Sequence, residues 1–153
     1  MGNIVAIVGR KSSGKSELSN YLIKEYGYQK ISFADYLREL ASQLYDISLS
    51  TFKDTVLKDK KFDVPLIWNY EKAKELAMLA DVNEHSFITR DFAEQKLESP
   101  RNLLQFLGTE VLKKYDRLFH VKKTIENLDL NKNYVCDDLR FPEEKVYLQS
   151  LKN

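Results

Sequence analysis

The residues best suited to chemistry lie near the start of the chain, in the stretch "GRKSSGKS" that begins at Gly9. It fits G-x-x-x-x-G-K-[S/T], a pattern whose backbone N–H groups cradle phosphate oxygens. Lys15 would neutralise the β- and γ-phosphates of ATP, and the Ser16 hydroxyl would ligate Mg²⁺. The alternative is a glycine-rich turn that starts a helix without a ligand. The residues that we expect to bind the nucleotide are Gly9, Ser12, Ser13, Gly14, Lys15 and Ser16.

Two acidic residues late in the chain could serve the same metal ion. Asp137 and Asp138 follow the apolar run "YVC". Enzymes with this phosphate loop hold Mg²⁺ partly through an acid at the end of a neighbouring strand. The pattern alone favours Asp137, because it is the first acid after the strand. Two acids in a surface turn before a helix would instead stabilise the helix N-terminus.

A second substrate would need polar groups of its own, and the stretch "SPRNLLQFLGTE" contains them. On a helix that starts near Pro100, each residue turns by about 100°, which places Arg101, Gln105 and Thr109 in one row. A guanidinium, an amide and a hydroxyl could recognise a phosphate and a base edge. Periodicity alone favours a solvated polar face over this binding role.

The segment "SFADYLREL" is open to two interpretations in the same way. Ser32 is a candidate N-cap for the helix that follows. Asp35 could reciprocate that cap, or it could face a substrate hydroxyl. Arg38 lies one turn further on and could bind a phosphate or stay solvated.

Strands and helices alternate along the chain, which predicts an α/β fold with a parallel sheet. The apolar run after Asn3 is typical of a strand buried on both faces. We expect further strands at 28–33 and 133–136, and helices at 15–26, 33–45, 99–115, 118–128 and from Pro142. Residues 48–98 are less regular. We interpret residues 1–153 as one domain in which 48–98 form a helical insertion.

Composition narrows the partners and the compartment. Lys and Arg number 24 against 23 Asp and Glu, a net charge of +1, so no strong overall field would attract nucleic acid or an anionic membrane. The lone cysteine, Cys136, is typical of a protein in the reducing cytoplasm, and we expect it to be a buried, inert thiol. No window approaches the ~18 apolar residues of a membrane span.

Four stretches taken together resemble one family, the phage-type deoxynucleoside monophosphate kinases. They are "GRKSSGKSEL", "ISFADYLREL", "SPRNLLQFLGTE" and "DDLRFPEE". Members of this family are P-loop enzymes that pass the γ-phosphate of ATP to a deoxynucleotide. The resemblance extends from the N-terminus to about Glu144, while residues 48–98 match poorly. It implies a P-loop NTPase-like fold of three layers, ATP and Mg²⁺ as cofactors, a (deoxy)nucleoside monophosphate as acceptor and, for a phage-encoded chain, the host cytoplasm.

The resemblance also implies roles for matching positions. The acid of the D-x-R-F-P pattern falls on Asp138, so the metal role moves there, with Asp137 second. Arg140 becomes a candidate for charge stabilisation during transfer. The residues that would line the acceptor site are Phe33, Asp35, Arg38, Arg101, Gln105 and Thr109. The residues with an expected catalytic role are Lys15, Asp35 and Arg140.

This sequence departs from the family's pattern at its end. Such kinases continue with two more strands and a basic lid, whereas three expected strands are counted here. The expected fold therefore has an open sheet edge, which a homodimer would cover. Two alternative functions follow: a non-catalytic nucleotide-binding or assembly module derived from such a kinase, or a P-loop kinase for another small acceptor.

Overall fold

The computed structural model describes residues 2–8, 14–129, 131–139 and 141–151. The chain divides into two compact units. The first unit combines Met1–Tyr36 with His120–Asn153, and the second is Leu37–Phe119. None of the helices in the described ranges has the length and hydropathy of a membrane-spanning segment.

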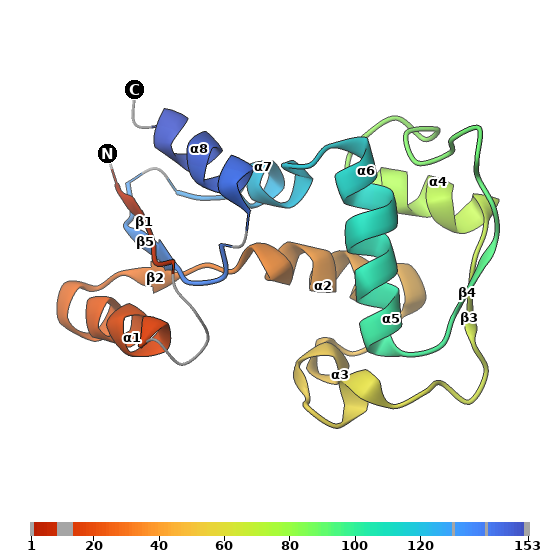
Figure 1. Ribbon diagram of the computed structural model, residues 1–153, viewed down its shortest axis with the longest axis horizontal. Coiled ribbons are helices and arrows are strands. Elements are labelled where there is room, and N and C mark those ends of the chain that lie inside the picture. The colour runs from red at the N-terminus through yellow and green to blue at the C-terminus, as the bar shows by residue number, and fades with distance from the viewer. Residues whose placement is uncertain (1, 9–13, 130, 140, 152–153) are drawn as a thin grey trace. The chain divides into compact units, whose positions relative to one another are not determined.

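The first unit is built on a three-stranded parallel sheet. Its strands are β1 (Ile4–Ala6), β2 (Gln29–Lys30) and β5 (Tyr134–Cys136), in the order β1-β5-β2. The central strand β5 is buried along its whole length, as expected for a strand covered on both faces. The prediction of an α/β fold with a parallel sheet is therefore confirmed (Figure 1).

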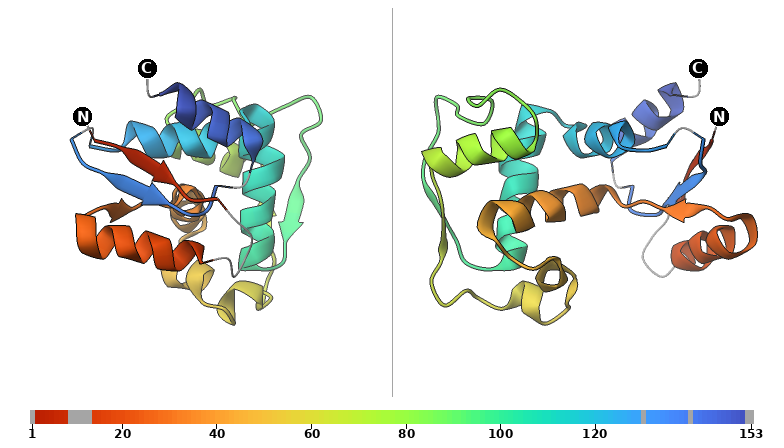
Figure 2. Two further views of the ribbon diagram at one scale, coloured as in Figure 1. Left: turned by 60° about the vertical axis from the view of Figure 1, so that its left-hand side comes forward. Right: turned by 180° about the vertical axis from the view of Figure 1, so that it is seen from behind.

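Helices cover both faces of this sheet. Helix α1 (Lys15–Tyr26) lies on one face, and α7 (Phe119–Glu126) and α8 (Pro142–Ser150) lie on the other (Figures 1 and 2). On the α7–α8 side, Val121 packs with Cys136 and Leu139 in a buried cluster that partly buried residues of α7 and α8 extend. The first unit is thus a three-layer arrangement.

Local chemistry sets the ends of α1 and α8. Gly14, just before α1, has φ 89°, a left-handed conformation that glycine adopts without a Cβ penalty. Gly27 ends α1 at φ 69°, with its N–H donating to the carbonyl of Leu22. Pro142 is the first residue of α8, where its missing N–H costs nothing. All three ends match the sequence expectation.

The second unit is mostly helical, and it also contains a small antiparallel sheet. Helix α2 (Phe33–Tyr45) begins in the first unit and continues into the second. The remaining elements in chain order are α3 (Leu49–Lys53), the 3₁₀ turn η1 (Leu57–Asp59), β3 (Leu66–Trp68), α4 (Tyr70–Leu79), β4 (Gln95–Leu97), α5 (Pro100–Gln105), the π-helical segment η2 (Phe106–Leu112) and α6 (Lys113–Tyr115). Strands β3 and β4 lie within residues 48–98, where only helices and loops were expected.

The helix expected over 99–115 starts as predicted and then changes type. Ser99 caps it, its hydroxyl accepting from the N–H of Asn102 at 3.1 Å. From Phe106 to Leu112 the turns widen to π-helical form, and the N–H of Lys113 donates to the carbonyl of Gly108, five residues back. The row expected for Arg101, Gln105 and Thr109 assumed uniform α-helical turns, whereas the turns widen after Gln105, so a shared face that includes Thr109 stays a prediction.

Candidate functional site

The expected phosphate loop joins β1 to α1. Lys15 and Ser16 are the first two residues of α1, and Ser16 is exposed. A helix of 12 residues directs the positive end of its dipole and its unpaired N–H groups at this point. The structure thus places both side chains at an anion-favouring helix end. The other expected loop positions, Gly9, Arg10, Lys11, Ser12 and Ser13, lie outside the described residues, so their cradle stays a prediction.

Asp138 lies just beyond the carboxyl end of β5 and is held by the segment that follows β2. The Ser32 hydroxyl donates to Asp138 Oδ2 at 2.6 Å, and the Ala34 N–H donates to the same oxygen at 3.3 Å. These groups meet because β2 and β5 are parallel neighbours whose carboxyl ends share one edge. Asp138 Oδ1 is buried and has no hydrogen-bond partner among the described residues.

Asp137 is engaged differently from its neighbour. Its carboxylate lies 3.5 Å from the Lys30 ammonium, and the Asp137 side chain is only 14% exposed. Lys30 Nζ and Asp137 Oδ2 are close enough to form an ion pair, but this distance is longer than that of a good hydrogen bond. Within the described ranges, no such cation stands beside Asp138. Asp137 Oδ2 and Asp138 Oδ1 are thus both buried oxygens without a hydrogen-bond donor among the described residues, and of the two only Asp137 Oδ2 lies at ion-pair distance from a cation there.

Whether Ser16 and Asp138 suit Mg²⁺ depends mainly on the buried oxygen Oδ1 of Asp138. The described part of the chain contains no cluster of three or more His, Cys, Asp or Glu that could hold a metal by itself. Mg²⁺ at nucleotide sites rarely needs such a cluster, because it is bound through one or two protein oxygens together with phosphates and water. Asp138 Oδ1 and the Ser16 hydroxyl are hard oxygen donors of this kind, so the residues present fit the ion.

Cys136 precedes the acidic pair and is buried. Burial, together with the negative charges of Asp138, Asp137 and Glu144, raises the pKa of its thiol to about 12. The thiolate is the reactive form of cysteine, so the thiol is protonated and inert at neutral pH. The prediction of a buried cysteine is confirmed.

Glu144 is a buried residue whose role the sequence did not reveal. It is 6% exposed, and its Oε1 accepts a hydrogen bond from the Phe141 N–H at 3.0 Å. The contact fixes the chain where it enters α8. The glutamate in "DDLRFPEE" therefore has a structural role at this helix start. Arg140, in the same stretch, lies outside the described residues, and its charge-stabilising role stays a prediction.

The residues expected around the acceptor belong to both units. Phe33 is 4% exposed and packs in the cluster with Val121, Cys136 and Leu139, which is a core position. Asp35 is partly buried, and its N–H donates to the Ser32 carbonyl at 3.1 Å. The second unit contains Arg38, Arg101, Gln105 and Thr109. Their joint role at one acceptor stays a prediction.

Arg101 has a partner that the sequence did not suggest. Its Nε donates to Asp59 Oδ1 and its Nη2 to Asp59 Oδ2, the latter at 3.3 Å. The pair raises the pKa of Arg101 and lowers that of Asp59, first through the hydrogen bond. Both side chains are about half exposed, at 47% and 52%. A guanidinium can donate two parallel N–H hydrogen bonds to a carboxylate or to a phosphate. Asp59 therefore accepts hydrogen bonds from the same N–H groups that would bind the phosphate of an acceptor.

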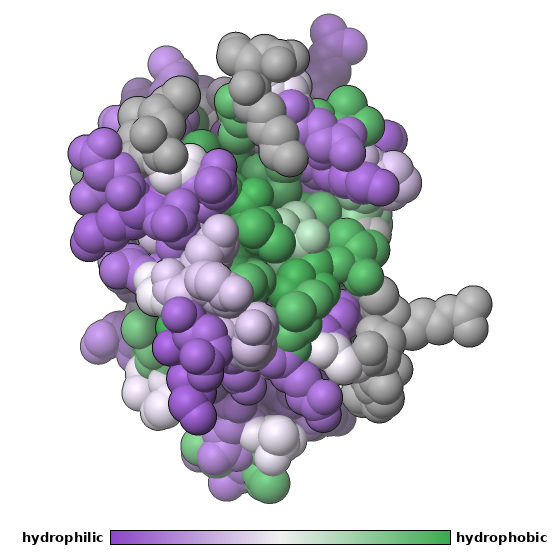
Figure 3. Space-filling view, turned by 90° about the vertical axis from the view of Figure 1, so that its left-hand side faces the viewer, coloured by the Kyte–Doolittle hydropathy of each residue, from purple (hydrophilic) through white to green (hydrophobic). Residues whose placement is uncertain are grey.

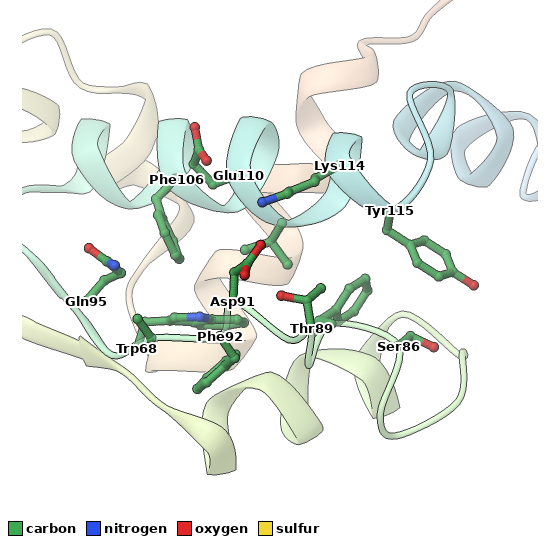
Figure 4. Close-up of a pocket in the computed structure, with 13 residues that line it drawn as sticks. Trp68, Ser86, Thr89, Asp91, Phe92, Gln95, Phe106, Glu110, Lys114 and Tyr115 are labelled. Carbon is green, nitrogen blue, oxygen red and sulfur yellow. The ribbon is translucent and has the colours of Figure 1, made fainter.

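The second unit also has a pocket of about 340 Å³ between the η2–α6 stretch, residues 86–95 and Trp68 (Figure 4). The Phe106 ring points toward Trp68, with the ring centres 5.6 Å apart. Its polar rim includes Asp91, Glu110 and Lys114. None of the expected acceptor residues lines this pocket.

Comparison with known proteins shows similarity to a distant relative. No family model matches the chain. A protein of Acanthamoeba polyphaga mimivirus, named "Putative deoxynucleotide monophosphate kinase", is 24% identical over 162 aligned residues. The alignment covers 97% of this chain and 69% of the viral protein. The chain is thus similar along nearly its whole length to a protein that bears a nucleotide kinase's name.

Proposed function

We propose that this protein is a nucleoside monophosphate kinase that transfers the γ-phosphate of ATP to a deoxynucleoside monophosphate. The observation that carries the proposal is that the candidate residues follow the carboxyl ends of two neighbouring parallel strands, β1 and β5. Lys15 and Ser16 start the helix after β1, and Asp138 follows β5, the strand next to β1. The similarity to the viral protein supports the nucleotide kinase assignment independently.

In the proposed reaction, an oxygen of the acceptor's phosphate attacks the γ-phosphorus of ATP, and the bond to the β-phosphate oxygen breaks. The products are ADP and a deoxynucleoside diphosphate. A phosphate acceptor is already ionised, so this chain's residues act by positioning and by charge neutralisation rather than as a strong base. Lys15 neutralises the transferring phosphates. Bound Mg²⁺ would add charge neutralisation to the transferring phosphates, and the side-chain oxygens of Ser16 and Asp138 would hold it.

The test is product formation with each acceptor in turn. Purified protein with Mg²⁺-ATP and one of the four common deoxynucleoside monophosphates should yield the matching diphosphate, separated by ion-exchange chromatography. Lys15→Met should abolish it, because the charge at the β- and γ-phosphates is lost. Lys24→Met, near the other end of α1, is the matched control and should leave turnover unchanged. If none of the four acceptors yields a diphosphate, the kinase assignment is refuted for this chain.

A second candidate function, a non-catalytic nucleotide-binding and assembly module, is favoured by the edge of the sheet. The β1 register directs the N–H and C=O of Ile4 and Ala6 away from β5. Among the described residues, these groups have no partner strand. The sequence "NIVAIV" around them contains no charge or proline that would discourage strand addition. Exposed apolar side chains follow at Val8 and on α1 at Leu18 and Tyr21, and the face of the molecule with β1 and α1 has a hydrophobic area at its middle (Figure 3).

The occupant that we propose for this edge is a second copy of the chain. A two-fold axis reverses strand direction, so β1 would pair antiparallel with its copy, and the neutral edge offers no charge repulsion against itself. In this function the protein binds ATP, forms a dimer and makes no diphosphate. Sedimentation over a range of protein concentrations, combined with the chromatographic assay, separates the two candidates. A monomer that makes diphosphate contradicts the module.

A further inference from the structure

We propose that Ser32 is a positioning residue that orients Asp138 toward the Mg²⁺ of the bound nucleotide. The inference rests on the proposed function, since it concerns the same metal. Sequence patterns suggest only that Ser32 caps a helix. In the structure its hydroxyl instead donates to Asp138 across 106 residues of chain, at 2.6 Å.

The two carboxylate oxygens of Asp138 differ in their hydrogen bonding. Oδ2 receives both protein donors, the Ser32 hydroxyl and the Ala34 N–H. Oδ1 is buried and receives none among the described residues. A buried carboxylate oxygen without a donor is costly unless a further partner arrives. The two donors fix the carboxylate's rotation, so this oxygen is presented in one direction before any ligand binds.

The arrangement around Ser32 explains why a hydroxyl is useful at this position. A charged donor on Oδ2 would give Asp138 a permanent counter-charge, as Lys30 gives Asp137 at ion-pair distance. A neutral donor orients Asp138 and leaves its charge uncompensated, so the attraction for a divalent cation is kept. Hydrogen bonds to metal-binding carboxylates commonly affect metal affinity by about 10–100-fold.

The experiment measures metal binding directly, with Mn²⁺ as the probe for the Mg²⁺ site. Electron paramagnetic resonance counts free Mn²⁺ as the full-length protein is titrated in the presence of a non-hydrolysable ATP analogue. Ser32→Ala should weaken Mn²⁺ binding by about 10–100-fold, and Ser32→Thr, which keeps the hydroxyl, should restore it. Ser42→Ala is the matched control. It removes another partly buried hydroxyl, which donates to the Ile47 carbonyl, and should leave Mn²⁺ affinity unchanged.

A double-mutant cycle separates positioning from a general loss of structure. If Ser32 acts through Asp138, then Ser32→Ala should weaken Mn²⁺ binding no further when Asp138 is already replaced by Asn. If Ser32→Ala does not fold, Ser32→Cys takes its place, and its weaker donor should reduce affinity by a smaller factor. Unchanged Mn²⁺ affinity in the folded Ser32 variant overturns the inference, as does an equal loss in the Asp138→Asn background.

The failure of this inference is distinguishable from failure of the proposed function. Binding of a fluorescent ATP analogue is measured in parallel, with Mn²⁺ and with a chelator. If the unaltered protein binds the analogue and Mn²⁺, but Ser32→Ala binds Mn²⁺ equally well, only the positioning role is refuted. If the unaltered protein binds neither, the proposed kinase site fails and this inference fails with it.

Discussion

Proline is expected to be tolerated at Ala6 and not at Val5, although the two positions are adjacent in β1. The register pairs Val5 with Val135 and Ala6 with Cys136, and the Ile7 N–H donates to the Cys136 carbonyl at 2.8 Å. Alternation along a strand then directs the Val5 N–H toward the Tyr134 carbonyl. The same alternation directs the Ala6 N–H away from β5, toward the open edge.

The magnitudes follow from these directions. Val5→Pro removes a hydrogen bond worth about 0.5–1.5 kcal/mol and orphans a buried carbonyl at a further cost of about 1–3 kcal/mol. The total loss of stability is about 1.5–4.5 kcal/mol. Ala6→Pro removes no bond within the sheet, and proline occurs on edge strands when its nitrogen faces outward. Its cost is about 1 kcal/mol or less.

Urea denaturation followed by circular dichroism measures both free energies of unfolding. Sedimentation of the same samples tests the proposed homodimer, because the proline at Ala6 blocks an added strand while the β1–β5 pairing is kept. A dimer of the unaltered protein should become monomeric in Ala6→Pro. The reasoning is refuted if Ala6→Pro destabilises the protein as much as Val5→Pro, since the register or the open edge would then be wrong.

Three further predictions concern contacts elsewhere in the chain. Gly2→Ala would place a Cβ 1.7 Å from the Lys132 carbonyl oxygen, so we expect a loss of about 1–3 kcal/mol in urea denaturation, and unchanged stability contradicts this close approach. The Cys136 thiol, with its pKa raised to about 12, should resist alkylation at pH 8 until urea unfolds the protein. The stability that the buried, protonated thiol of Cys136 contributes is fully present below about pH 8.5. It is lost as the pH rises toward 12, because the thiol ionises at lower pH in the unfolded chain than in the folded protein. Asp59→Asn should release the Arg101 guanidinium and lower the KM for the acceptor monophosphate, most clearly at low salt, and a KM that does not change would remove Arg101 from the acceptor site.

The parts of the fold that the sequence predicted well have strong local signals. Helix α1 is bounded by Gly14 and Gly27, which both adopt left-handed backbone conformations. Glycine is the residue that most readily adopts this conformation, so glycines at helix ends are strong boundary signals in a sequence. Strand β5 is a short apolar run, and Pro142 indicates the start of α8. Such signals depend on neighbours only a few residues away, so a single sequence reveals them.

The parts that the sequence missed depend on distant partners. Strand β4, "QKL", shows no apolar alternation and becomes a strand only by pairing with β3. The Arg101–Asp59 pair joins residues 42 positions apart, and the Ser32–Asp138 contact joins residues 106 positions apart. The widened turns of η2 also have no clear marker in "FLGTEVL". Lys15 and Asp138 could thus be predicted as candidate site residues from residue type and spacing, whereas the hydrogen bond from Ser32 to Asp138 could not.

The most direct test of the central claim follows the fate of a labelled γ-phosphate. Protein is mixed with γ-labelled ATP, Mg²⁺ and a deoxynucleoside monophosphate, and the nucleotides are separated after a single turnover. The account predicts that the label appears on the β-phosphate of the deoxynucleoside diphosphate and that Lys15→Met prevents it. Label that stays on ATP with all four acceptors, or that appears only as inorganic phosphate, would contradict the account.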